Sequence, residues 1–207
     1  MILYIESNFV LEIVLAQEQA SHAEQLLSLA EARAIELAVP EFSINEPFST
    51  LARRSNERNQ LSALLSKELT QLNRSTHGQP LASHLHSVPN DLVQLQQRER
   101  DELDRVVATL LRVGRIMGLT SSSYVVAQHA QTQWGLSAQD AIIYGVVLSD
   151  ARKRDAQEPK LFVSRNSKDF QDPDIIQELN AAGCSYLGDF QSCVGLLRAN
   201  GIIPQAT

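Results

Sequence analysis

Short apolar runs that alternate with longer helical stretches constrain the fold of this chain most strongly. Such runs stand at residues 2–5, 35–39, 161–164 and 184–187. Each is long enough for one buried strand, and the stretches between them have the spacing of amphipathic helices. Buried strands separated by helices are typical of a parallel sheet that is covered on both faces. The sequence therefore predicts a three-layer α/β/α fold of the α/β class with a short parallel sheet.

Capping residues predict where the helices begin. A carboxylate, hydroxyl or amide side chain before a helical stretch can accept hydrogen bonds from its first amide groups. The predicted starts are Ser7 and Asn8 before residues 9–16, a Ser-rich turn at 121–123, Ser137 before a helix through Ala151, Asp172 followed by Pro173, and Asp189.

The middle of the chain departs from this alternation. Residues 43–74 and 91–117 both show the apolar stripe of a long helix, and residues 75–90 between them contain prolines and a glycine and are predicted to form a loop. These two helices exceed what a connection between strands needs. We expect a single domain over residues 1–207, with an antiparallel helical hairpin inserted at about 50–118.

Charge and cysteine content exclude several classes of protein. The formal net charge is −6, so no global basic field indicates nucleic-acid binding. Cys184 and Cys193 are too few for a disulfide framework and lack zinc spacing, which is typical of a reduced cytoplasmic protein. The first apolar run has no basic segment before it and stops at Glu6, so neither a signal peptide nor a membrane span is expected.

Four carboxylates lie where strands should end or helices begin: Glu6, Glu46, Asp140 and Asp169. The carboxyl ends of parallel strands meet at one edge of a sheet, so these side chains could gather there. Oxygen-only ligands favour Mg²⁺ or Mn²⁺, and such sites commonly cleave phosphodiesters.

The contexts of the four acids resemble the PIN-domain family of metal-dependent ribonucleases. The matching segments are Ile5-Glu6-Ser7-Asn8, Ser43-Ile44-Asn45-Glu46, Asp140-Ala141-Ile142-Ile143 and Ser164-Arg165-Asn166-Ser167-Lys168-Asp169-Phe170. The resemblance covers about residues 1–50 and 120–190 and does not explain residues 51–118. Two departures from the family pattern are Glu6 in place of the usual Asp, and Asn166 where some members carry Asp.

The resemblance implies an endoribonuclease that uses Mg²⁺ or Mn²⁺, similar to toxin components of bacterial toxin–antitoxin pairs. It implies Glu6, Asp140 and Asp169 as metal ligands, and Glu46 as a ligand of a second ion or an orienter of water. Asn8, Ser164 and Asn166 would hold the carboxylates through hydrogen bonds. The implied partners are an RNA substrate, a second copy of the chain in a homodimer, and an antitoxin or other protein.

Each of these residues also has a simpler interpretation. Asp140 lies three residues after Ser137 and could only cap a helix. Arg53 and Arg54 could hold the RNA backbone or could belong to a solvated, ion-paired helix face. Glu41 competes with Glu46 for the second position, although Pro40 before it indicates a helix start. A non-catalytic PIN-like module that binds RNA or protein is therefore the alternative function.

Overall fold

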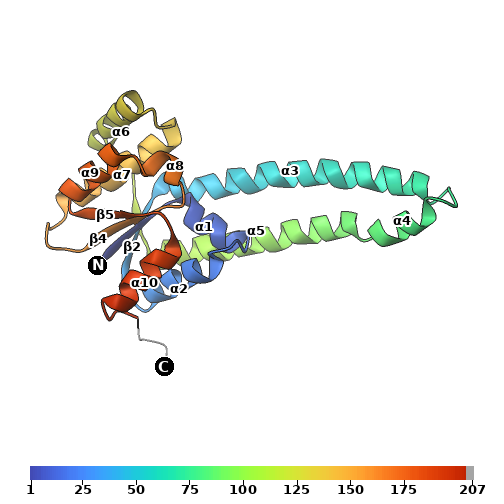
Figure 1. Ribbon diagram of the computed structural model, residues 1–207, viewed down its shortest axis with the longest axis horizontal. Coiled ribbons are helices and arrows are strands. Elements are labelled where there is room, and N and C mark those ends of the chain that lie inside the picture. Colours follow the sequence, from blue (N-terminus) through green and yellow to red (C-terminus); the bar gives the residue numbers. More distant parts are fainter. Residues whose placement is uncertain (204–207) are drawn as a thin grey trace. The chain divides into compact units, whose positions relative to one another are not determined.

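A five-stranded parallel sheet forms the centre of the compact unit that contains residues 1–47 and 105–207. A computed structural model gives the structure of residues 1–203 (Figure 1). The strands are β1 (Ile2–Ile5), β2 (Glu36–Pro40), β3 (Arg115–Met117), β4 (Lys160–Val163) and β5 (Cys184–Leu187). They pair in the order β3-β2-β1-β4-β5, and every pair is parallel. The predicted α/β fold with a parallel sheet is confirmed.

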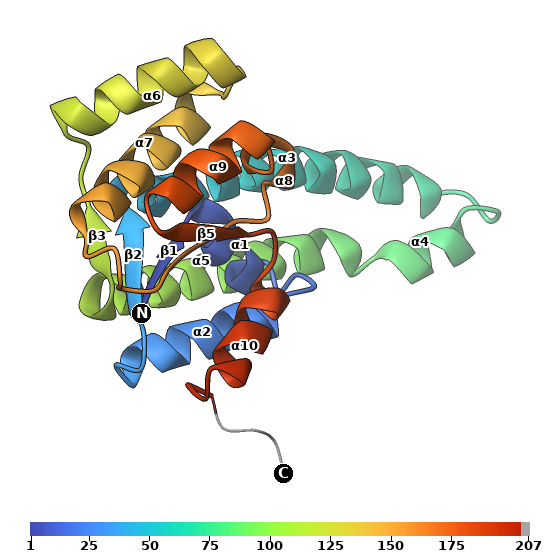
Figure 2. The same cartoon turned by 60° about the vertical axis from the view of Figure 1, so that its left-hand side comes forward.

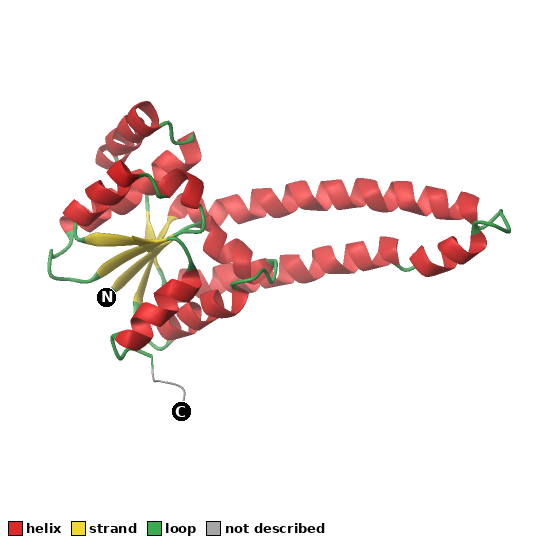
Figure 3. Ribbon diagram, in the orientation of Figure 1, coloured by secondary structure: helices red, strands yellow, loops and turns green. Residues whose placement is uncertain are grey.

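Helices cover both faces of this sheet (Figures 2 and 3). One face carries α6 (Ser121–Trp134), α7 (Ala138–Lys153) and α9 (Pro173–Ala181), which share a buried apolar cluster with Ile2, Tyr4 and Phe162. The other face carries α1 (Ser7–Val14), α2 (Ala20–Glu31) and α10 (Phe190–Ala199). There the rings of Phe9 and Phe190 meet edge to face, with 5.4 Å between their centroids.

The strand order places a reversal of topology beside β1. The chain moves from β1 outward to β2 and β3, and then crosses back to add β4 and β5 on the other side of β1. Two strands on opposite sides of such a reversal send their following segments apart, and this leaves a crevice at their carboxyl ends. The residues that follow β1 and β4 are therefore at the position where an open parallel sheet holds a ligand.

The chain divides into two compact units. One contains residues 1–47 with 105–207, and the other contains Phe48–Asp104. The second unit includes most of α3 (Glu41–Leu72), α4 (Gln79–Leu85) and most of α5 (Val88–Val113). Within it α3 and α5 contact each other through an ion pair between Arg58 and the buried Glu99, 2.5 Å apart. The boundaries expected for a single domain with an insertion stay a prediction.

Three details differ from the sequence-based expectations. The helix predicted to reach Met117 ends at Val113, because residues 115–117 pair with β2 and form the edge strand β3. The loop predicted at 75–90 contains α4, which has Pro80 in its first turn, where a proline is compatible with a helix. The first helix begins at Ser7, and its N-cap is Glu6.

No helix within residues 1–203 is long and apolar enough to cross a membrane.

Candidate active site

Glu6 lies at the junction of β1 and α1 and is 3% exposed. Its backbone is extended while Ser7 begins the helix, so the carboxylate folds back over the first turn. Glu6 Oε2 accepts a hydrogen bond of 2.8 Å from the backbone N–H of Asn8. A carboxylate in this position satisfies an unpaired amide of the helix and interacts favourably with the helix dipole.

The Ser7 hydroxyl connects Glu6 to Glu46. Ser7 Oγ lies 2.9 Å from Glu6 Oε2 and 2.6 Å from Glu46 Oε2. A hydroxyl has one proton to donate, yet here it meets two carboxylates. One of the two contacts therefore requires a proton on a carboxyl group, or a cation that replaces that proton. Glu46 comes from the first turns of α3, forty residues further along the chain.

A second chain of hydrogen bonds connects Glu6 to Asp140. The buried Ser164, directly after β4, donates from its hydroxyl to Glu6 Oε1 at 2.9 Å and accepts from the backbone N–H of Asn166 at 2.9 Å. Asn166 Nδ2 in turn donates to Asp140 Oδ1 at 3.0 Å. The site thus lies at the carboxyl ends of β1 and β4 and reaches the amino end of α7.

Asp140 is also held by the residue that caps its helix. The Ser137 hydroxyl accepts from the backbone N–H of Asp140 at 3.1 Å and lies 2.5 Å from Asp140 Oδ2. The capping contact expected from the simpler interpretation of Asp140 is therefore present, together with the contact to Asn166. These two contacts fix both carboxylate oxygens in place.

Burial raises the pKa of Glu6 to about 7. Hydrogen bonds from Asn8, Ser164 and Ser7 favour the charged form and act in the opposite direction, while the charge of Glu46 raises the pKa further. The hydrogen bonds do not offset the loss of water, so Glu6 carries a proton for part of the time at neutral pH. A nearby cation would remove that preference.

The chemistry of these donors suits a hard divalent cation, although they do not enclose one. Glu6, Glu46 and Asp140 offer only oxygen atoms as ligands. Because the Ser7 hydroxyl has a single proton for both Glu6 and Glu46, these two carboxylates lack one proton or cation between them. Within residues 1–203, no group of three or more His, Cys, Asp or Glu side chains has the spacing to hold a metal ion. Mg²⁺ commonly binds through one or two carboxylates and completes its shell with water and phosphate.

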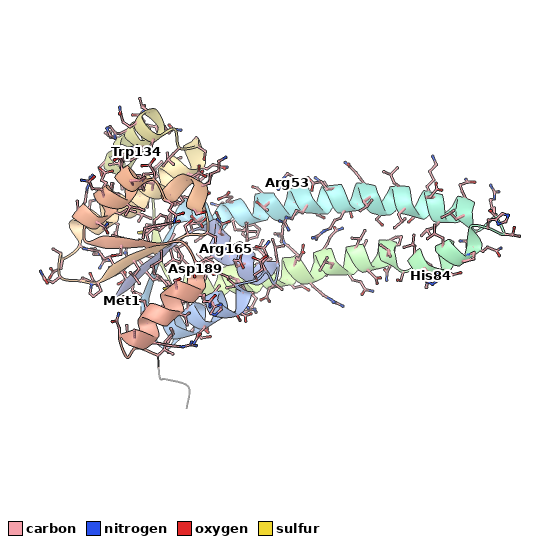
Figure 4. The ribbon with its side chains drawn as sticks, in the orientation of Figure 1. Met1, Arg53, His84, Trp134, Arg165 and Asp189 are labelled. Carbon is pink, nitrogen blue, oxygen red and sulfur yellow. The ribbon has the colours of Figure 1, made fainter. Side chains whose placement is uncertain are left out.

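The side chains of the remaining predicted residues lie outside this network. Asp169 is half-buried on the short helix α8 (Ser167–Phe170), and in the described part of the chain its carboxylate makes no hydrogen bond or ion pair. Asn8 contributes its backbone N–H. Arg53, labelled on α3 in Figure 4, pairs with Glu57 at 3.0 Å, and both side chains are exposed.

Three residues that matter here were missed by reasoning from the sequence. Ser7 was interpreted only as a helix cap, although it stands directly after a carboxylate at a strand end. Glu12 falls within the predicted amphipathic helix, and Arg165 falls within the last of the four motif segments. The structure pairs these two side chains. A carboxylate on the buried face of a helix is a signal that a basic partner exists elsewhere, because unpaired buried charge is costly.

The chain is similar to one protein family and to a solved structure. A family model described as a PIN domain matches residues 3–170. Among solved structures, the chain is similar to the crystal structure of VapBC2 from Rickettsia felis bound to a DNA fragment from their promoter. That similarity has a TM-score of 0.46 and 11% sequence identity, and it covers 90% of this chain and 98% of the other. No curated protein matches the chain.

Proposed function

Because the chain belongs to the PIN-domain family, we propose that it is an endoribonuclease that hydrolyses RNA phosphodiester bonds with Mg²⁺ or Mn²⁺. The observation that carries this proposal is the hydrogen-bonded chain through Glu46, Ser7, Glu6, Ser164, Asn166 and Asp140. It connects three carboxylates from distant parts of the sequence near the carboxyl ends of β1 and β4. Carboxylates collected where a parallel sheet binds ligands are suited to metal-assisted phosphodiester chemistry.

In this proposal Glu6, Glu46 and Asp140 would hold the cation together with water and phosphate, and Asp169 would be a further carboxylate available to it. A bound divalent ion would supply an activated water and would stabilise charge on the phosphate. The chain's own contribution is orientation. Ser7, Ser164 and the Asn8 N–H aim the Glu6 carboxylate, and Asn166 and Ser137 aim Asp140.

The proposed partners follow from the same assignment. RNA is the substrate, and Arg53 and Arg54 on α3 are proposed contacts to its backbone, because guanidinium groups bind phosphate. A homodimer and an antitoxin or other protein partner are proposed from the family, with a cytoplasmic location.

The test of the nuclease assignment is the Asp140→Asn variant. Asparagine keeps the shape of Asp140 and one of its two hydrogen-bonding oxygens, but it removes the charge that would hold a cation. We expect RNA cleavage to be abolished, with a change in the free energy of unfolding below about 1 kcal/mol. Cleavage of a labelled RNA with Mg²⁺ or Mn²⁺, together with urea unfolding, measures both quantities.

Asp174→Asn is the matched control. Asp174 is an exposed carboxylate in the first turn of α9. Its replacement by asparagine is the same chemical change, made at a residue outside the hydrogen-bonded network. This variant should cleave RNA like the unmodified protein. Undiminished cleavage by Asp140→Asn would remove the basis of the nuclease assignment.

A non-catalytic module that binds RNA or protein is the second candidate. It is favoured by the fact that neutral donors already satisfy Glu6 through three hydrogen bonds, and that Ser137 and Asn166 already hold Asp140. The two candidates differ in their response to metal. A nuclease site should raise the melting temperature with millimolar Mn²⁺, and Glu6→Gln should lose that rise. No rise in the unmodified protein would favour the module.

A further inference from the structure

Arg165 stands between two residues of the candidate site but sends its side chain elsewhere. Its neighbours Ser164 and Asn166 contact Glu6 and Asp140, whereas its guanidinium pairs with Glu12 of α1 and Glu18. Figure 4 labels Arg165 at the end of the sheet where α1 lies. Arg165 is therefore next in sequence to two residues of the candidate site, while its guanidinium lies against Glu12 of α1 and Glu18.

The two partners of Arg165 differ in how firmly they are held. Glu12 is 2% exposed, and its second oxygen accepts from the backbone N–H of Gln19 at 3.0 Å, so it is fixed on both sides. Removing its guanidinium would leave a buried charge without a partner. Glu18 is 83% exposed and meets Arg165 Nη2 at 2.9 Å. An exposed ion pair of this kind contributes little and can exchange.

A surface pocket of about 660 Å³ includes both members of this ion pair, Arg165 and Glu18, in its lining. It is lined by Asn8, Glu12, Ala16, Gln17, Glu18 and Arg165. Asn8 borders both the pocket and the carboxylate site, since its backbone N–H donates to Glu6. Asn8 is therefore the residue that the pocket and the candidate site share, and Arg165 is the cation in the wall of the pocket.

We infer that Arg165 binds a backbone phosphate of the RNA beside the carboxylate site, and that the Glu18 carboxylate occupies that phosphate position until the RNA displaces it. This inference rests on the proposed function, because it assigns a further contact between the protein and its proposed RNA substrate. A guanidinium binds carboxylate and phosphate with the same planar set of N–H donors, so one can replace the other. Glu12 keeps Arg165 in place while Glu18 leaves.

The inference makes Glu18 an internal competitor of RNA. Glu18→Gln should then tighten RNA binding by about two- to fivefold, which is what loss of an exposed ion pair can contribute. Glu24→Gln is the matched control, because Glu24 is an exposed carboxylate on α2 whose side chain contacts no arginine among the described residues. It removes the same charge and should change affinity much less.

The experiment uses the full chain with Asp140→Asn in every variant, so that RNA binds without being cleaved. Fluorescence anisotropy of a fluorescein-labelled oligouridine, in Mg²⁺ and over a series of salt concentrations, gives the affinity and its salt dependence. A second pair of variants tests Arg165 without leaving a charge buried. Glu12→Gln alone is compared with Glu12→Gln plus Arg165→Gln.

Loss of one phosphate contact should reduce the slope of log affinity against log salt concentration by about 0.7 for single-stranded RNA. The double variant should show this reduction relative to Glu12→Gln, with melting temperatures measured for both to confirm folding. A tighter Glu18→Gln variant together with this loss of slope supports the inference.

Two results would overturn it. If RNA binds but Glu18→Gln behaves like Glu24→Gln and the slope does not change, Arg165 only neutralises Glu12, and the nuclease assignment stands. If no variant binds RNA, the proposed function fails and the inference fails with it.

Discussion

At the scale of single residues, Glu6 is a buried carboxylate that is surrounded by neutral donors. Ser7, Asn8 and Ser164 give it hydrogen bonds, but the charge closest to it in the network belongs to Glu46. Hydrogen bonds from neutral groups only partly replace the water that burial removes. Glu6 therefore binds a proton or a cation more favourably than an exposed glutamate would, and this difference in affinity is measurable.

Glu6 should make the folded protein less stable as pH rises. Its pKa is about 7 in the folded state and 4.5 for an ordinary glutamate, so the folded state binds the proton more tightly. The free energy of unfolding contributed by Glu6 is therefore highest below pH 4.5 and falls between pH 4.5 and 7. The unmodified protein should lose about 2–3 kcal/mol relative to Glu6→Gln between pH 5 and pH 8.

Urea unfolding of both proteins at the two pH values, without divalent metal, measures this difference. Other groups titrate in the same range, and the comparison with Glu6→Gln removes their contribution. Equal pH dependence in the two proteins would show that Glu6 is ionised at an ordinary pKa.

Replacement by alanine should change the free energy of unfolding differently at two fully buried serines. Ser164 Oγ donates to Glu6 and accepts from Asn166, so Ser164→Ala should cost about 1–3 kcal/mol in the free energy of unfolding. Within residues 1–203 the Ser43 hydroxyl is buried without a hydrogen-bond partner, so Ser43→Ala should be neutral or stabilising. Equal losses in urea unfolding would mean that the contacts of Ser164 contribute nothing.

The acids of the candidate site could be proposed from the sequence, but the hydrogen bonds that connect them could not. Glu6, Glu46 and Asp140 follow from their places at strand ends and helix starts together with the family resemblance. The bridging role of Ser7 depends on the first turns of α3 approaching α1, which no local pattern encodes. The roles of Glu6, Glu46, Asp140 and Asp169 as metal ligands stay predictions.

At the scale of elements, the contact between α6 and α7 depends on a glycine. A β-carbon on Gly145 of α7 would collide with the carbonyl oxygen of Ser123 and would lie 3.0 Å from the amide nitrogen of Ala127, both in α6. Backbone atoms cannot yield as a flexible side chain can. Gly145 is therefore required for the close approach of the two helices on that face of the sheet.

Gly145→Ala should lower the free energy of unfolding by about 1–3 kcal/mol, because α6 must move away from α7. Gly195 of α10 is the matched control, since a β-carbon there would have no atom within 4 Å. Gly195→Ala should stabilise the protein by about 0.5–1 kcal/mol through helix propensity. Thermal or urea unfolding of both variants checks the pair, and a destabilised Gly195→Ala would contradict the explanation.

Elements with strong local signals could be predicted, and those set by tertiary pairing could not. The caps Ser137, Asp172 and Asp189 begin helices as the sequence indicates. The strand β3 was missed because its three residues continue the apolar pattern of α5 and become a strand only by pairing with β2. Ser7 and Asn8 resemble ordinary caps, so the use of Glu6 as the cap was not anticipated.

At the scale of the whole molecule, the second unit exposes large apolar side chains. Its exposed leucines and valine are Leu61 (54%), Leu64 (68%), Leu81 (53%), Val93 (50%) and Leu95 (40%). Two paired helices cannot cover all of their own apolar surface, and exposed apolar patches commonly mark contacts with other proteins. This is consistent with the proposal of a homodimer.

Sedimentation velocity should therefore show a dimer at micromolar concentration. Leu61→Glu combined with Leu64→Glu should shift the protein to a monomer with unchanged helix content by circular dichroism, because both side chains already face solvent. A monomer for the unmodified protein at tens of micromolar, measured in about 0.15 M salt, would contradict the dimer.

The arrangement of the strands also determines when the site can exist during folding. Glu6 and Ser164 make a direct hydrogen bond although they are 158 residues apart along the chain. Contacts between such distant residues form slowly, and ribosomes deliver the amino-terminal partner first. During synthesis β1 has no β4 neighbour at first, and the link from Glu6 through Ser164 and Asn166 to Asp140 cannot form until that strand has emerged. If the proposed ribonuclease activity needs that link, a nascent chain would leave the RNA around it intact, and cleavage would begin only after β4 and the residues that follow it have been synthesised.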